Sequence, residues 1–319
     1  MLTDLDYEAA VAVAVRAPSV HNTQPWRFAR DADRILLRAD RDRWLPVEDP
    51  LERELHLSCG GALRHLVLGL RIRAFEARTE LVPDPGDDDL LAVVTVTGSR
   101  PPTLPEVTLH HAVWTRHTDR GRFQPVDVPA AAVEQLRTVA EADGCHLDVL
   151  DDRGAGLLAV LGARAEHLLE TDPDLAGEQQ RWTTHLVMPI EGVPTTPDAV
   201  RGSDVPLRRF TTADPLPSAA SDDPPVAEHP LLCVLSTDDD SPPGWLTAGW
   251  ALSDLLLTIE AEQLAASPFT QVLELPGLRA QLAGGLGLQA HPQVVLRVGV
   301  PEPGSAPTTG RRPAREVMD

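Results

Sequence analysis

The chain has 319 residues, of which 42% are hydrophobic, and this content is ordinary for a folded domain and argues against global disorder. Its formal net charge of −20 argues against nucleic acid and anionic membrane surfaces as partners. Lysine is absent, so all 28 basic residues are arginines, and any anion site has to be built from Arg, His and backbone amides.

The cysteines and the N-terminus indicate the compartment. Cys59, Cys145 and Cys233 are scattered without Cys-x-x-Cys spacing, so neither a zinc site nor a disulfide framework is expected. The first residues, Met-Leu-Thr-Asp-Leu-Asp, are acidic where a signal peptide is basic, and no apolar run approaches the length of a membrane span. We therefore expect a cytoplasmic protein.

The first third of the chain alternates helices and strands. Residues 4–16 predict an Ala/Val-rich helix that ends before Pro18, because proline disfavours helical geometry in the residue that precedes it. A short strand is expected at 35–39. Leucines at helical spacing predict a long helix over 50–74, and the apolar run at 90–96 predicts a strand buried on both faces.

The rest of the chain repeats this order in expanded form. The expected elements are helices at 129–143, 153–170, 174–185 and 245–266, and strands at 147–150 and 292–299. Gly249–Leu252 in the last long helix is comparable to Gly60–Leu63 in the first. A degenerate internal duplication explains this echo, and the alternative is the pair of helix–strand units that any α+β protein contains.

Residues 187–229 are rich in Pro, Gly, Asp and Thr and lack periodicity. A loop of this length in a compact domain is either functional, as a lid, or disordered, and 214–225 is expected to be its most mobile part.

A polar loop follows the first helix. It reads Pro18-Ser19-Val20-His21-Asn22-Thr23-Gln24-Pro25-Trp26, and its tryptophan is expected to fix the loop on the core. His21 is the titratable group of this loop, and a packing role is favoured over a proton donor.

A basic stretch, Arg116-His117-Thr118-Asp119-Arg120, combines guanidinium groups with a hydroxyl, the groups that bind phosphate best. On a helical or turn backbone Arg116 and Arg120 share a face. The alternative is a solvated basic turn, but in so acidic a chain an anion explains the cluster better. A second basic stretch, 310–317, follows the last strand, and its alternative is a frayed tail.

Two further clusters contain potential metal ligands but lack the spacing of a metal site. His110 and His111 with Glu106 lack further ligand spacing and predict a loop or a helix start. Asp238–Asp240 are not followed by an EF-hand glycine and predict a solvated turn that caps the next helix. No Walker loop or Gly-x-Gly-x-x-Gly after a strand is found.

The loop Pro18–Trp26 and the stretch Arg116–Arg120 together resemble the two flavin-binding motifs of the nitroreductase family. Their order is reversed here, which is similar to the Acg-type branch, in which one chain carries both halves. The resemblance implies an α+β, nitroreductase-like fold with a central mixed sheet flanked by helices, a pseudo-dimer within one chain. The expected halves are 1–104 and 105–319, the second with a lid at 187–229.

The resemblance also implies a cofactor, FMN, and the residues that bind it. The basic motif would hold the phosphate, with Arg311 returning from the C-terminal stretch and Arg312 as a near alternative. The loop would lie along the ring, although Val20 stands where the family often has a second serine. Pro189–Gly192 resembles the stretch that approaches flavin N5, but it precedes the helix that it should follow, and Gly192 would alternatively belong to the lid. The cofactor-binding residues implied are Pro18, Ser19, Asn22, Arg116, His117, Thr118, Arg120, Gly192 and Arg311.

The family's chemistry implies a function. NAD(P)H would reduce FMN, which would in turn reduce nitroaromatic or quinone-like acceptors, with no side chain needed as a catalytic acid or base and no metal. The alternative is a catalytically weak flavin-sequestering or storage protein whose lid covers FMN. A monomer and a homodimer both remain open.

Overall fold

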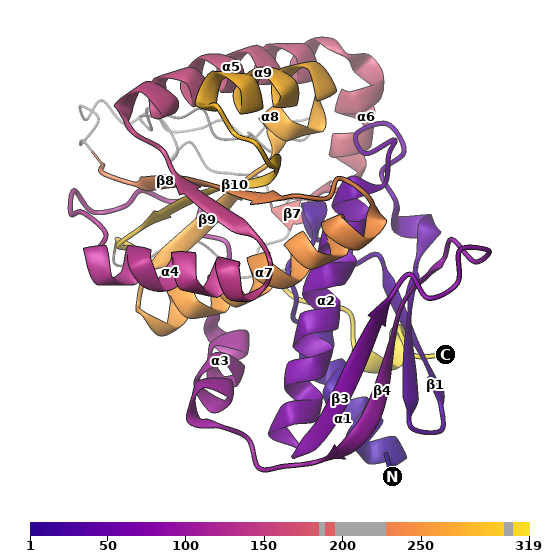
Figure 1. The fold of residues 1–319 in the computed structure, drawn as a ribbon. Coiled ribbons are helices and arrows are strands. Elements are labelled where there is room, and N and C mark those ends of the chain that lie inside the picture. The colour runs from indigo at the N-terminus through magenta and orange to yellow at the C-terminus, as the bar shows by residue number, and fades with distance from the viewer. Residues whose placement is uncertain (185–188, 195–227, 303–308) are drawn as a thin grey trace. The chain divides into compact units, whose positions relative to one another are not determined.

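The computed structural model describes residues 1–184, 189–194, 228–302 and 309–319 and divides into two compact units (Figure 1). The first unit comprises Met1–Arg116, Asp239–Ala261 and Arg311–Asp319, and the second comprises His117–Asp238 and Glu262–Gly310. These units interleave along the chain, whereas the sequence predicted consecutive halves at 1–104 and 105–319. The predicted halves refer to a repeat in the sequence, which the division into compact units does not test, so they stay a prediction. Most of the expected lid, 214–225 included, lies outside the described residues.

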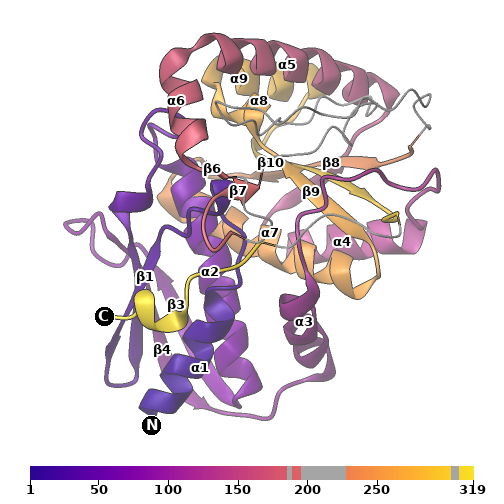
Figure 2. The same cartoon turned by 180° about the vertical axis from the view of Figure 1, so that it is seen from behind.

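The first unit is built on a four-stranded antiparallel sheet of order β1-β2-β4-β3. Helices α1 and α2 pack against it, and the hydrophobic core lies between them (Figure 2). The C-terminal residues lie beside β1, where the Phe28 amide donates to the Val317 carbonyl at 2.7 Å. The elements are α1 (Asp4–Ala14), η1 (Val20–Asn22), β1 (Trp26–Asp31), β2 (Arg34–Ala39), η2 (Arg41–Arg43), α2 (Arg53–Ile72), β3 (Phe75–Leu81), β4 (Leu90–Ser99), α3 (Leu104–Thr115), α7 (Pro242–Ala261) and η4 (Ala314–Glu316).

Helices α2 and α7 come into backbone contact through two glycines. A Cβ added at Gly60 would lie 2.1 Å from the carbonyl oxygen of Leu246, and one added at Gly249 would lie 2.0 Å from that of Leu57. Each glycine therefore faces the residue three positions before the other. Only glycine permits so close an approach, and the two segments compared in the sequence are the ones that meet here.

The second unit holds another four-stranded antiparallel sheet, of order β5-β8-β10-β9. Helices α5, α8 and α9 bury their apolar side chains against one face of it, and α4 lies on the other side (Figure 1). A short parallel pair, β6 and β7, is separate. The elements are α4 (Ala130–Ala142), β5 (His146–Val149), α5 (Asp152–Thr171), α6 (Pro173–Arg181), β6 (Thr183–Thr184), β7 (Val193–Pro194), β8 (Leu231–Thr237), β9 (Ala265–Phe269), α8 (Gln271–Glu274), α9 (Pro276–Leu286) and β10 (His291–Gly299).

The two sheets have the same topology. In each, the strands occur in the spatial order first, second, fourth, third, and a 20-residue helix, α2 or α7, lies in the chain between the second and third strands. The α+β class is confirmed. The expected central mixed sheet is not found in the described part of the chain, where both four-stranded sheets are antiparallel. Short hairpin connections such as that between β1 and β2 produce antiparallel pairs, whereas parallel pairs need crossovers.

The long helix expected at 245–266 is wrong at its C-terminal end. Helix α7 stops at Ala261, Gln263 has a left-handed φ of 60°, and Ala265–Phe269 is strand β9. A left-handed residue cannot continue a right-handed helix, so the alanine-rich composition was misleading. No helix in the described part of the chain combines the length and the apolar character that crossing a bilayer requires.

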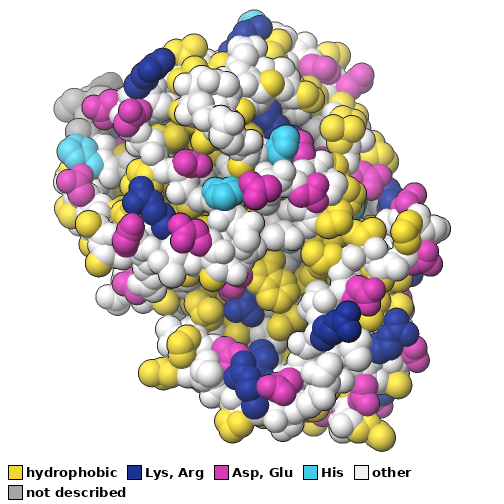
Figure 3. Space-filling view, in the orientation of Figure 1, with side chains coloured by type: hydrophobic (Ala, Val, Ile, Leu, Met, Phe, Trp, Pro, Cys, Tyr) yellow, Lys and Arg dark blue, Asp and Glu magenta, His cyan; other side chains and the backbone are white. Residues whose placement is uncertain are grey.

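Charged side chains of both signs are interspersed on the face in Figure 3, where the basic side chains stand near acidic ones. This distribution fits the acidic composition. Two arginines of the first unit, Arg16 and Arg116, form no ion pair with any residue that the structure describes, as detailed next.

Candidate functional site

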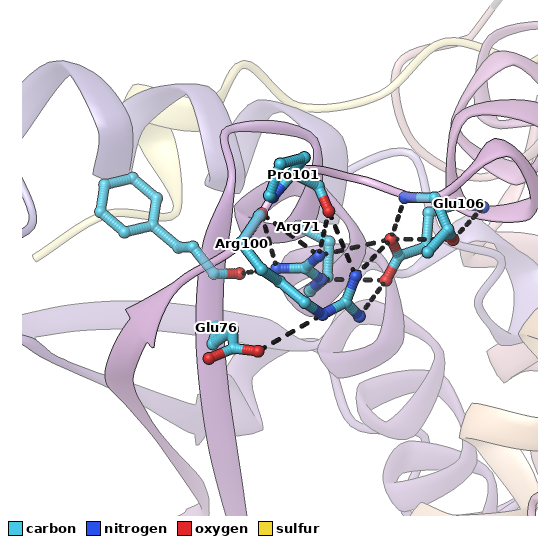
Figure 4. Close-up of polar contacts among 7 residues, drawn as sticks. Arg71, Glu76, Arg100, Pro101 and Glu106 are labelled. Carbon is cyan, nitrogen blue, oxygen red and sulfur yellow. Dashed lines mark hydrogen bonds and ion pairs between the residues drawn. The ribbon is translucent and has the colours of Figure 1, made fainter.

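Helix α3 carries Arg116 at its C-terminal end, and an ionic network fixes where that helix begins (Figure 4). Thr103 and Glu106 form a capping box, and Glu106 also accepts hydrogen bonds from Arg71 at 2.9 Å and from Arg100 at 2.8 Å. Burial alone would raise the pKa of Glu106, but the hydrogen bonds from Arg71 and Arg100 outweigh it and lower the pKa. Glu106 thus holds the start of α3 and does not serve as a metal ligand.

The remainder of α3 is anchored by packing. Ala112 and Val113 are buried in a cluster with Val13 of α1, Leu68 of α2 and Leu257 of α7. His110 and His111 lie within this helix, not in a loop or at a helix start as expected. Among the described residues no group of His, Cys, Asp or Glu is arranged to hold a metal ion. The position of Arg116 is therefore set by both ends of a well-fixed helix.

The loop after α1 has a strained backbone. His21, Asn22 and Gln24 have positive φ values of 45°, 55° and 55°, in a region that residues other than glycine rarely occupy. Side chains stabilise this shape: the Ser19 Oγ accepts from the Gln24 amide at 3.0 Å, and the Ser58 Oγ accepts from the Val20 amide at 3.1 Å. Such strain persists only when the surroundings impose it, and it clusters at functional sites.

His21 and Trp26 fix this loop to the core. The His21 Nε2 lies 2.7 Å and 2.8 Å from the two carboxylate oxygens of Glu48, and both side chains are buried. Trp26 is fully buried at the start of β1. The geometry therefore suits the packing role that was favoured for His21.

Arg311 and Arg312 are neighbours in the chain but have different hydrogen-bond partners. The Arg312 guanidinium pairs with the buried Asp40 at 3.3 Å, and its backbone amide donates to the Gln24 Oε1 at 2.8 Å. The Arg311 Nε instead donates to the Ala17 carbonyl at 3.1 Å, at the start of the strained loop. Of the two alternatives, Arg311 is the one directed toward the loop and Arg116.

Three arginines from distant parts of the chain gather at the C-terminal end of α1. The Arg116 Nη2 donates to the Arg16 carbonyl at 3.4 Å, and Arg311 donates to the next carbonyl, that of Ala17. Arg116 is buried, and neither Arg16 nor Arg116 forms an ion pair with any described residue. The Nε atoms of both are shielded from solvent and have no hydrogen-bond partner in the described part of the chain.

The cluster's charges act on one another. Burial, followed by the charge of Arg16, lowers the pKa of Arg116 to about 10, and Glu260 acts in the opposite sense. Burial, followed by the charges of Arg116 and Arg16, lowers the pKa of Arg311 to about 9. Both remain protonated at neutral pH, so the cluster is a concentration of positive charge that an anion would stabilise.

A histidine of α2 lies within reach of the same charges. Burial, followed by the charges of Arg116, Arg64 and Arg311, holds the pKa of His65 well below its usual value. His65 is fully buried and therefore neutral at physiological pH. It adds no charge to the arginine cluster.

The rest of the basic motif belongs to the second unit. Arg116 has a ψ of 132°, which ends α3, and Thr118 forms a parallel bridge with Ala266. The stretch is extended, so the helical face that Arg116 and Arg120 would have shared is not formed. This extended segment carries His117, Thr118 and Arg120.

A buried arginine of β10 holds the turn that follows Arg120. The Arg297 Nη1 donates to the Gly121 carbonyl at 3.1 Å, and its guanidinium lies 4.1 Å from the centre of the Phe123 ring. Arg297 also pairs with the buried Glu228, which accepts from the Phe123 amide at 3.1 Å. Nothing in the local sequence around Arg297 indicates this role, because its partners are far away in the chain.

Gly192 has a structural reason to be glycine. Its φ is 77°, and a Cβ there would lie 2.7 Å from the Trp182 carbonyl oxygen. The turn is closed by the amide of Val193, which donates to the same oxygen at 2.8 Å. This requirement exists whether or not a ligand binds nearby.

Comparison with known proteins gives close relatives over the full chain. The Mycobacterium tuberculosis H37Rv protein "Putative NAD(P)H nitroreductase Rv3131" is 33% identical over 315 residues, which cover 97% of this chain and 90% of the relative. "Putative NAD(P)H nitroreductase acg" from the same organism is 33% identical over 325 residues, covering 100% of this chain and 96% of the relative. No family model matches the chain.

Solved structures resemble the chain more weakly. A BluB-like flavoprotein from Clostridium difficile 630 has a TM-score of 0.43 and 14% identity, over 66% of this chain and 97% of that one. A nitroreductase with bound FMN from Desulfitobacterium hafniense DCB-2 has a TM-score of 0.42 and 11% identity, over 63% of this chain and 92% of that one. Likenesses at this level carry no inference about this chain.

Proposed function

The chain belongs to the nitroreductase family of its mycobacterial relatives, in the Acg-type branch, and from this premise we propose that it binds FMN and reduces nitroaromatic or quinone-like acceptors with NAD(P)H. The observation that carries the proposal is the pair Arg116 and Arg311. These residues are 195 positions apart in the chain and yet are held by consecutive carbonyls at the end of α1. Two guanidinium groups gathered in this way suit a phosphate.

The donor set of the first unit fits FMN. Arg116 has a solvent-shielded Nε with no partner among the described residues, which is unfavourable unless an acceptor binds there. Pro18, Ser19 and Asn22 belong to the strained loop, and the residue just before that loop, Ala17, accepts the Arg311 hydrogen bond. We assign the phosphate to Arg116 and Arg311 and the flavin ring to the loop.

The remaining contacts are assigned from the family motifs alone. His117, Thr118 and Arg120 complete the basic motif, and Gly192 would present a backbone amide to the ring. These assignments rest on the family resemblance. Bound FMN supplies the hydride chemistry, whereas the protein binds and orients it and controls access. No side chain is proposed as a general acid or base.

The equal strand order of the two sheets supports a pseudo-dimer made of two fused halves. The reciprocal contacts of Gly60 and Gly249 on α2 and α7 support it as well, because equivalent helices related by a two-fold axis make such contacts. The flavin-storage alternative depends on the lid at 187–229, which lies largely outside the described residues. The activity assay below distinguishes it from the enzyme that we propose.

The absorbance spectrum of the purified full-length protein tests the cofactor. We expect a flavin spectrum that survives gel filtration, with about one FMN per chain. NAD(P)H oxidation in the presence of a nitroaromatic acceptor then tests the activity. A colourless protein that FMN does not reconstitute would overturn the cofactor assignment. A stable flavoprotein without NAD(P)H oxidation would overturn the enzyme and favour storage.

A further inference from the structure

Arg16 is the member of the arginine cluster that neither sequence motif contains. It lies just after the C-terminal end of α1, two residues before the polar loop, and is partly buried. Its guanidinium lies 5.7 Å from the centre of the Trp114 ring, and Trp114 is the residue two positions before Arg116. The end of α3 therefore both carries Arg116 and supports the side chain of Arg16 through a cation–π contact.

Arg16 contributes to the cluster in two ways. Its backbone carbonyl accepts the hydrogen bond that orients Arg116. Its own Nε is shielded from solvent and has no partner in the described part of the chain. Cations near the C-terminal end of a helix are stabilised by the helix dipole, and that favours Arg16 at this position.

The site proposed above holds a phosphate, and the present inference rests on that proposed function. We infer that Arg16 is the third guanidinium of this site and makes the site selective for a doubly charged phosphomonoester. Arg116 and Arg311 each carry a positive charge, and Arg16 adds a further charge that acts on both. The Nε of Arg16 is shielded from solvent without a partner among the described residues, so a second negative charge on the ligand is stabilised more strongly when Arg16 is present. The selectivity of the site for the dianion over the monoanion is then assigned to Arg16.

The groups that face the cluster come from each element packed around it. Among the residues that the structure describes, they are Arg16 just after α1, Arg64 and His65 of α2, Arg116 at the end of α3, Glu260 of α7 and Arg311 of the C-terminal segment. Arg64 is already paired with Asp254, whose carboxylate oxygens both lie 2.7 Å from its Nε. His65 is neutral. The ligand's second ionisation, with a pKa of about 6, is thus the titration that the site senses near neutral pH.

The pH dependence of affinity is the test. The full-length protein is freed of flavin and titrated with FMN at pH 7.5 and pH 5.0. If the dianion is the bound form, the wild-type affinity falls about tenfold at pH 5.0, because about a tenth of the phosphate is then dianionic. Arg16→Gln weakens FMN at pH 7.5 about tenfold or more and loses most of this pH dependence. Arg16→Lys, which keeps the charge, retains the pH dependence.

Two controls separate this role from folding and from general charge. Riboflavin, which lacks the phosphate, binds Arg16→Gln and the wild type equally. Arg137→Gln removes the same charge from an exposed position on α4 and leaves the pH dependence intact. An Arg16→Gln variant with an unchanged ratio of FMN affinities at the two pH values would overturn the inference while leaving FMN binding in place.

Inorganic phosphate tests the cluster without any flavin. At constant ionic strength it raises the thermal midpoint of the flavin-free wild type at pH 7.5, and Arg16→Gln abolishes that rise. If FMN fails to bind but phosphate still stabilises through Arg16, the proposed function fails and the anion site stands. Equal stabilisation of wild type and Arg16→Gln by phosphate would contradict the role of Arg16.

Discussion

Arg311 and Arg312 are neighbours with opposite surroundings, so alanine substitutions at the two positions should have opposite consequences. Arg311 lies beside like charges and donates to the Ala17 carbonyl. Arg312 pairs with the buried Asp40 and donates to the Glu316 carbonyl at 3.0 Å. We expect Arg311→Ala to weaken FMN binding and Arg312→Ala to weaken the fold.

The magnitudes follow from the contacts removed. A hydrogen bond to a charged group contributes roughly 1.5–3 kcal/mol, so Arg311→Ala should raise the Kd for FMN by about 10- to 150-fold. Arg312→Ala leaves the Asp40 carboxylate buried without its cation, and breaking a buried pair costs roughly 3–5 kcal/mol. Arg311→Ala removes one of three neighbouring positive charges, so it should cost less stability than Arg312→Ala.

The assay measures both quantities on both variants. FMN and riboflavin are titrated into the flavin-free protein, and unfolding of that protein in guanidinium gives the stability. Riboflavin affinity should be almost indifferent to Arg311→Ala. The reasoning is refuted if Arg311→Ala weakens riboflavin as much as FMN, or if the two variants lose equal stability.

Three further predictions follow from single contacts. Gly60→Ala should destabilise the first unit by about 1–3 kcal/mol in chemical unfolding, since the new Cβ would lie 2.1 Å from the Leu246 carbonyl oxygen. The control Gly61→Ala should be neutral or stabilising, because the atom nearest to its Cβ is 3.6 Å away. Burial raises the pKa of Asp49 to about 7 from 3.8, so its contribution to stability is present below pH 3.8 and lost as the pH rises through 7. Unfolding at pH 5 and pH 8 should therefore show Asp49→Asn gaining stability relative to the wild type at the higher pH, and an equal difference at both pH values would contradict this. Ser19→Ala removes the acceptor of the Gln24 amide and should weaken riboflavin and FMN alike, about 2- to 10-fold, in the same titrations.

Local signals in the sequence were sufficient for the longer elements. The helices α1, α2, α4 and α5 lie within a few residues of their predicted positions. Their apolar periodicity extends over many residues, and stop signals such as Pro18 are visible in the local sequence. Strands β1, β3 and β8 were not predicted. Their pairing partners are distant or their sequences are polar, as in Phe75-Glu-Ala-Arg-Thr-Glu-Leu81, and such strands are defined by the neighbours with which they pair.

In the candidate site, too, some residues could be predicted from the local sequence and others only from the fold. Arg116 and Arg311 were selected because they belong to stretches that resemble known motifs, and the structure brings both to the end of α1. Arg16 has no motif around it, and a single arginine at the end of a helix is usually a solvated, dipole-favoured residue. Only the fold places its carbonyl under Arg116 and its guanidinium over Trp114.

The chain has many more acidic than basic residues, and most described arginines form an ion pair with a carboxylate. Arg16 and Arg116 form none with any residue that the structure describes, and the carboxylate of Glu260 acts on Arg116 only through its charge. Leaving positive charge buried and unbalanced costs stability, so an acidic protein keeps it only where a bound anion restores the balance. Among the described residues Arg16 and Arg116 lack the ion pairs that other arginines form, and this difference is the physical reason for proposing an anion-binding site at this end of α1.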